Sequence, residues 1–152
     1  MRTNRLLRSI SSKELEHLLA RAHWLRCPME TVVVQQGSPV DAVLFLTEGR
    51  AAAVMEVPVP GSRDFWAFVH FLGPGADIGL LSLVDGAPHP ATVTALGDVQ
   101  AVAIPVDVLQ HYLRSHPARY RALAQVAVEN LRTYQKAFPH GWTRLEPGHV
   151  LC

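Results

Sequence analysis

The chain has 152 residues, of which 49% are hydrophobic, and its formal net charge is +1 at pH 7. This length and apolar content predict a single domain with a sizeable core. The near-neutral charge argues against nucleic-acid binding by this chain alone, because a surface that follows phosphates normally shows a clear excess of Lys and Arg. With two cysteines, no signal-peptide core and no apolar run near the roughly 20 residues of a membrane helix, the chain is predicted to be cytoplasmic.

The first segment carries helical signals. Ser11 and Glu14 have the spacing of a capping box at a helix start. The apolar residues that follow recur at helical spacing and form one stripe, which consists of Leu15, Leu18, Leu19 and Ala22. We therefore predict that residues 5–27 form an N-terminal helical part.

From Glu30 the pattern changes to short strands separated by turns. The segments with this pattern are ETVVVQQG, VLFLTEG, RAAAVMEV, FWAFVHFL, ATVTAL and VQAVAI. The first three end at turn residues or just before one, namely Gly37, Gly49 and Pro58. Because no long helix separates the strands, residues 28–104 are predicted to form an antiparallel barrel rather than a parallel sheet.

The last third is predicted to be helical. One helix begins near Pro105, and a longer one runs from Pro117 to about Ala137 with an apolar stripe at three- and four-residue steps. The predicted fold is therefore mainly β with flanking α: an antiparallel double-stranded β-helix, or jelly-roll, barrel with an N-terminal helix and a long C-terminal helix. The domain is expected over residues 1–138, with its C-terminal helices at 105–138, and residues 139–152 are expected to form a tail.

This order of elements resembles the cyclic nucleotide-binding domain over nearly the whole chain, from about Leu7 to Tyr134. The stretches that carry the resemblance are QQGSPVDAVLFLTEGRAAAV, FLGPGADIGLLSL and HPATVTA. Within the family the chain most resembles the effector half of bacterial transcription regulators of the cyclic AMP receptor protein and fumarate-nitrate reduction regulator type. The resemblance implies a regulatory, non-enzymatic sensor that requires no cofactor and takes cyclic AMP or cyclic GMP as its ligand.

The segment from Ile78 to Val93 resembles the family's phosphate-binding cassette. A glycine turn, a short apolar helical turn and a second glycine turn lead into a strand. The resemblance implies these ligand-binding candidates: Ile78, Gly79, Leu80, Leu81, Ser82, His89, Pro90, Ala91 and Thr92.

Three cassette positions depart from the family pattern. Leu80 stands where the family has a glutamate for the ribose hydroxyl, and His89 stands where it has an arginine for the cyclic phosphate. Pro90 lacks the backbone N–H that the family uses at that position. Together these losses are worth about 5 kcal/mol or more at roughly 1.5–3 kcal/mol for each charge-assisted bond. We therefore expect cyclic nucleotides to bind weakly or not at all, unless Ser82, Thr92 or the long helix supplies replacements.

The cassette residues also have purely structural interpretations. The sequence leaves both the structural and the ligand-binding interpretation open. Leu80 fits a core position better than a ligand contact, because Leu81 and Leu83 continue the apolar turn. His89, between two prolines, fits an exposed turn better than an anion site. Gly79 and Gly86 are expected to be turn glycines whatever the function.

The long helix suggests a second functional surface. Its stripe predicts a two-helix dimer seam that comprises Tyr120, Leu123, Ala127, Asn130, Leu131 and Tyr134. The resemblance implies that Tyr134 or Gln135 would close over a bound base. The alternative is that this stripe covers the chain's own barrel, as any amphipathic helix must do.

A metal-dependent jelly-roll enzyme is the rival from another class. Such barrels bind metals through closely spaced histidines and a carboxylate. The eight histidines include no pair one or three residues apart within a predicted strand, so no metal site is expected. The predicted partner is a second copy of this chain, bound through the 117–137 helix. The resemblance places any DNA-binding domain beyond residue 152.

Overall fold

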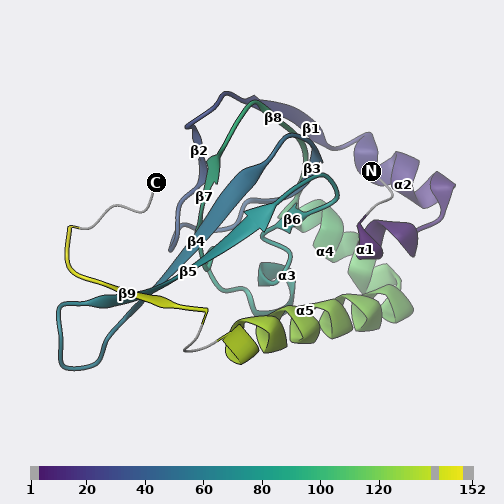
Figure 1. The fold of residues 1–152 in the computed structure, drawn as a ribbon. Coiled ribbons are helices and arrows are strands. Elements are labelled where there is room, and N and C mark those ends of the chain that lie inside the picture. The colour runs from purple at the N-terminus through teal and green to yellow at the C-terminus, as the bar shows by residue number, and fades with distance from the viewer. Residues whose placement is uncertain (1–3, 138–140, 149–152) are drawn as a thin grey trace.

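A computed structural model of the chain describes residues 4–137 and 141–148. Its helices are α1 (Arg5–Arg8), α2 (Ser12–Leu19), α3 (Ser82–Asp85), α4 (Val106–Ser115) and α5 (Pro117–Ala137). Its strands are β1 (His23–Cys27), β2 (Val32–Val34), β3 (Ala42–Glu48), β4 (Ala51–Pro58), β5 (Phe65–Leu72), β6 (Asp77–Ile78), β7 (Thr92–Ala95), β8 (Val99–Pro105) and β9 (Thr143–Leu145). The strands gather on one side of the molecule and the larger helices on the other (Figure 1).

The strands form two antiparallel sheets, as the predicted jelly-roll arrangement requires, but the barrel is not closed. One sheet has the order β1-β8-β3-β6, and the other has the order β2-β7-β4-β5-β9. Strand β6 has two residues, and it pairs with β3 through Leu44 and Phe45. Gly79 follows it with φ +91, so the chain leaves the strand conformation directly after β6.

The two central strands of the four-stranded sheet, β3 and β8, are buried on both faces, which explains the continuous apolar run of β3. Val43 and Phe45 face a core that they share with the helices, whereas Leu44 and Leu46 face the second sheet. Strand β8 alternates in the same way, with its larger side chains toward the helices and alanines toward the other sheet. Such runs are expected where both faces of a sheet are covered.

The capping box predicted at Ser11 is confirmed. The Ser11 hydroxyl accepts a hydrogen bond from the Glu14 backbone N–H, and the Glu14 side chain accepts one from the Ser11 backbone N–H. Leu15 and Leu18 of α2 are buried in the helix-side core, where they join Leu123 of α5. The N-terminal helices therefore cover the same sheet face as α4 and α5.

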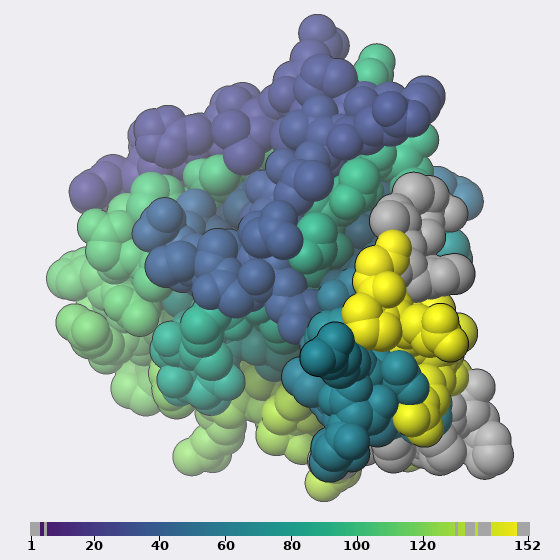
Figure 2. Space-filling model, turned by 90° about the vertical axis from the view of Figure 1, so that its left-hand side faces the viewer, coloured from purple at the N-terminus to yellow at the C-terminus, as the bar shows by residue number. Residues whose placement is uncertain are grey.

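Two segments differ from the sequence-based expectation. Residues 23–27, which were expected to be helical, form strand β1, paired with β8 from His23 and Ala103 to Cys27 and Val99. The apolar stripe of α2 has no continuation beyond Ala22, and cross-strand pairing decides the conformation there. Within the expected tail, β9 pairs with β5 and adds an edge strand to the second sheet, beside the tip of the β4–β5 hairpin (Figure 2).

Candidate functional site

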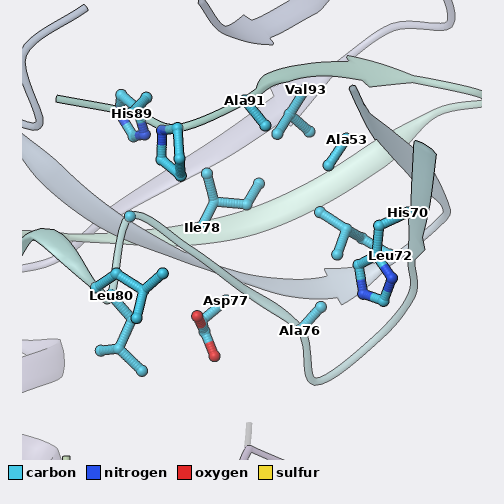
Figure 3. A pocket seen from close by; sticks show the side chains of 13 residues that line it. Ala53, His70, Leu72, Ala76, Asp77, Ile78, Leu80, His89, Ala91 and Val93 are labelled. Carbon is cyan, nitrogen blue, oxygen red and sulfur yellow. The ribbon is translucent and has the colours of Figure 1, made fainter. Parts of the chain in front are cut away.

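A cavity of about 230 Å³ opens between the two sheets, beside the cassette. Figure 3 shows Ile78, Leu80 and His89 on one side of it and His70 and Leu72 on the other. The remaining lining residues are mostly small or apolar: Ala53, Ala76, Asp77, Gly79, Leu81, Pro90, Ala91 and Val93. Ala53 of β4 and Ala91, just before β7, have side chains too short to fill the space between the sheets. The cavity therefore exists because these side chains are small.

The predicted glycine turns shape the wall of this cavity. Gly79 has φ +91, and a Cβ there would lie 3.0 Å from the Val40 side chain and 3.1 Å from the His89 ring. Gly86 ends α3 with φ 69, and its N–H donates to the Ser82 carbonyl at 2.9 Å. Both turns therefore need glycine for its backbone conformation, and Gly79 also needs it for the close approach of His89.

His89 is buried, with 5% of its surface exposed, so the expectation of an exposed turn histidine was wrong. Its backbone explains the difference. The His89 N–H donates to the Ser38 carbonyl, and its own carbonyl accepts from the Gly37 N–H, both at 2.9 Å. These bonds hold the segment against the preceding turn and direct the ring inward over Gly79. Burial lowers the pKa of His89, although the nearby charge of Asp41 opposes that shift.

Asp77 contributes the carboxyl group of the lining. Burial raises the pKa of Asp77, and a hydrogen bond from Asn4 partly offsets that effect. The Asn4 amide nitrogen donates to Asp77 Oδ2 at 3.0 Å and to the Gly75 carbonyl at 3.1 Å. The Asn4 side-chain oxygen also accepts from the Leu6 N–H and caps α1. No local sequence pattern singles out Asn4 or Asp77, because only the tertiary fold brings residues so distant in sequence together.

The family model for the cyclic nucleotide-binding domain matches residues 24–116, which include the cavity wall and the cassette. The chain belongs to the cyclic nucleotide-binding domain family. The family is one of regulatory ligand-binding domains, and the cavity described above lies beside the segment predicted to form its cassette.

Individual relatives agree with this assignment. The chain is 25% identical over 126 residues to a lysophospholipase, nte1, of Neosartorya fischeri; the match covers 83% of this chain but only 8% of the relative's length. The N-terminal domain of a transcriptional regulator from Streptomyces coelicolor A3(2) has 27% identity and a TM-score of 0.66, with 91% and 94% of the two chains covered. The catabolite activator protein of Thermus thermophilus has a TM-score of 0.70 at 21% identity, which covers 86% of this chain and 59% of that one and shows the fold alone.

The other predicted cassette residues differ in their burial and in whether they line the cavity. Leu80 is 2% exposed and belongs to the helix-side core, while it also lines the cavity. Ser82 is buried in α3 and Ile78 in β6, whereas Pro90 is exposed. Thr92 does not line the cavity, and its hydroxyl accepts a hydrogen bond from the Gln36 N–H at 3.0 Å. Leu81, Pro90 and Ala91 all line the cavity.

Helix α5 divides the predicted dimer residues between two faces. Leu123 is fully buried and Ala127 is 6% exposed, so the prediction that they face a second subunit was wrong. Leu123 packs in the domain's own core. Tyr120 and Leu131 are exposed, at 43% and 52%. The side chains of Asn130, Tyr134 and Gln135 lie outside the part of the chain that the structure describes.

A second hollow, of about 460 Å³, lies between α2 and α4. The Tyr112 hydroxyl donates to Glu14 Oε2 at 3.2 Å, and His116 Nε2 lies 3.0 Å from Glu14 Oε1. His116 also stacks on the Tyr112 ring, with the ring centroids 4.3 Å apart. These contacts join α2 to the end of α4 and stabilise the helix packing.

Among residues 4–137 and 141–148, no group of three or more His, Cys, Asp or Glu side chains is arranged to hold a metal ion. Within the same residues, no helix has the length and apolar character needed to cross a membrane.

Proposed function

We propose that this domain is a regulatory, non-enzymatic sensor of the cytoplasm, resembling the effector half of transcription regulators of the cyclic AMP receptor protein type. We further propose that its cassette does not hold a cyclic phosphate through the family's usual contacts. The observation that carries the proposal is the lining of the cavity. No Lys or Arg is among the described residues that line it. The resemblance implies that Leu80 and His89 stand at the two positions where the family has its side-chain ligand contacts.

The electrostatics of the cavity support this proposal. A cyclic phosphate carries one negative charge, and a buried site normally stabilises it with a fixed cation and backbone N–H groups. Burial lowers the pKa of His89, which favours its neutral form at pH 7. Asp77 lines the cavity as well, and its carboxylate form would repel an anion.

The missing contacts are large relative to ordinary ligand affinity. Three charge-assisted hydrogen bonds at roughly 1.5–3 kcal/mol each amount to a deficit of about 5 kcal/mol or more, although such terms do not add cleanly. Micromolar binding corresponds to about 8 kcal/mol. We therefore expect cyclic AMP and cyclic GMP to bind no more tightly than the millimolar range.

Calorimetric titration with cyclic AMP and cyclic GMP tests this proposal. We expect no saturable heat from the unaltered chain. The double variant His89→Arg with Pro90→Ala restores a cation and a backbone N–H, so it should gain measurable affinity. His17→Arg adds the same charge on the exposed face of α2, outside the cavity, and should gain none. Micromolar binding by the unaltered chain would contradict the proposal.

A second proposed function is self-association through α5. Exposed apolar side chains remain on this helix at Tyr120, Val128 and Leu131, with 43%, 45% and 52% of their surfaces exposed. Val128 lies about two turns beyond Tyr120, and Leu131 lies about one turn further on, so the three form one strip along the helix. This strip lies beside the buried face of α5, which packs on the domain's own core.

Sedimentation equilibrium tests the proposed dimer. We expect the unaltered chain to be a dimer and the Val128→Arg variant to be a monomer, because the substitution places a charge in the centre of the strip. Gln125→Arg adds the same charge at an exposed polar position of the same helix and should leave the dimer intact. A monomeric unaltered chain, or an equal loss of dimer in both variants, would contradict self-association through this strip.

A further inference from the structure

We propose that the cavity binds a small uncharged molecule of one or two fused rings, whose polar edge forms a hydrogen bond with the His89 ring. This inference rests on the proposal that the cassette does not hold a cyclic phosphate, and it names the class of ligand that the same cavity takes instead. Three observations carry it: the absence of cations among the described lining residues, the unused hydrogen-bonding capacity of the His89 ring, and the volume of the cavity.

The walls of the cavity favour an uncharged, mainly apolar occupant. The walls come from both sheets and the cassette, with Ala53, Ile78 and Val93 contributing apolar surface. The charged side chain among the described lining residues is Asp77, which already accepts a hydrogen bond from Asn4. An anion would lose its hydration shell here without gaining a cationic partner, and burying an unpaired charge is strongly unfavourable.

The His89 ring has unused hydrogen-bonding capacity. The side chain is 95% buried, as its exposed fraction of 5% shows. Its backbone groups are paired with Ser38 and Gly37, but its ring nitrogens have no hydrogen-bond partner within residues 4–137 and 141–148. A neutral imidazole has one N–H donor and one acceptor nitrogen. Buried polar groups in proteins are nearly always hydrogen-bonded, so the ring is ready to pair with a ligand.

The volume limits the size of the ligand. An engineered cavity of about 150 Å³ lined by apolar side chains holds benzene. The cavity here, at about 230 Å³, is larger by roughly the difference between one ring and two fused rings. Ala53 is decisive for this space, because it lies between Val93 and His70 on the inner face of the second sheet. A larger side chain at this position would occupy the cavity directly.

Indole is the probe for this inference, followed by amide chemical shifts in NMR titrations. Indole should bind with a dissociation constant of about 0.1–1 mM, as expected for a ligand of this size. 1-Methylindole lacks the N–H donor, so it should bind about 3- to 10-fold more weakly. In His89→Leu, indole should lose the same factor, and the difference between indole and 1-methylindole should disappear.

Matched controls test whether the ligand must be uncharged and whether it binds in the cavity. Indole-3-carboxamide and indole-3-carboxylate have nearly the same shape, and the carboxylate should bind at least tenfold more weakly because it carries the anion. Ala53→Leu should abolish indole binding, whereas Ala52→Leu, on the opposite face of the same strand, should leave it unchanged. Ala91→Val is a second cavity-filling variant if Ala53→Leu fails to fold.

Each outcome decides the inference. It is overturned if indole does not bind, if carboxylate and carboxamide bind equally, or if the folded cavity-filling variants bind indole as well as the unaltered chain does. Failure of this inference is distinct from failure of the proposed function. Silence with indole and with cyclic AMP would overturn only the ligand class, whereas micromolar binding of cyclic AMP would overturn the proposed function itself.

Discussion

Asn4 anchors the first helix to the floor of the cavity, and we predict that Asn4→Ala destabilises the domain by about 2–4 kcal/mol. Asn4 is 6% exposed, and its side chain makes three hydrogen bonds, to Leu6, Gly75 and Asp77. Loss of the helix cap is worth about 1 kcal/mol. Stranding the buried Asp77 carboxylate and the Gly75 carbonyl adds about 1–3 kcal/mol. The sum is a large share of a typical total stability of roughly 5–15 kcal/mol.

The predicted loss depends on pH in a defined direction. Burial raises the pKa of Asp77 above its ordinary value of 3.8, and the bond from Asn4 lowers it. A carboxyl group with a raised pKa contributes stability that is fully present below its unfolded pKa and is lost as the pH rises through its folded pKa. Asn4→Ala removes the bond to the carboxylate and raises the pKa of Asp77 further. The deficit should therefore be larger at pH 7 than at pH 4.

Urea unfolding monitored by circular dichroism measures this deficit. Ser11→Ala is the matched control, because Ser11 also caps a helix but is exposed and makes its side-chain bond within its own cap. Its loss should stay near 1 kcal/mol. The reasoning is refuted if Asn4→Ala costs no more than Ser11→Ala. It is also refuted if Asp77→Ala, which removes the acceptor, leaves the effect of Asn4→Ala unchanged in a double-mutant cycle, because the two side chains would then be uncoupled.

Three further predictions concern the turns and the cavity wall. Gly49→Ala should destabilise the domain more than Gly37→Ala in urea unfolding. Both glycines have positive φ, but a Cβ at Gly49 would also collide with the Asp98 carbonyl oxygen. Equal losses of stability in the two variants would argue against the collision. Leu80→Ala should cost about 2–5 kcal/mol, because Leu80 is 2% exposed in the helix-side core; a loss below about 1 kcal/mol would contradict that packing. The lowered pKa of His89 contributes stability that is fully present above pH 6.5 and is lost as the pH falls through the folded pKa. His89→Gln should therefore lose less stability than the unaltered chain between pH 7 and pH 5, and an unchanged pH profile would contradict it.

The sequence by itself determined the features that depend on local chemistry. The capping box at Ser11 is read from two residues three positions apart, and it forms as predicted. Gly79 and Gly86 have the positive φ that was expected of turn glycines. Leu80 is in the core, as the apolar turn around it suggested. Caps, turns and hydrophobic periodicity are properties of neighbouring residues, so a single sequence contains them.

Only the tertiary structure decided the features that depend on distant partners. The ring of His89 is buried because its backbone is held by Ser38, and no local pattern predicts that bond. Asn4 reaches Asp77 across 73 positions of sequence. Leu123 packs in the domain's own core rather than against a second subunit. The sequence could not decide this, because an amphipathic stripe indicates that a helix face is covered but not what covers it. Strands β1 and β9 likewise exist through pairing with β8 and β5, and strand pairing stabilises a segment only when the fold supplies the neighbour.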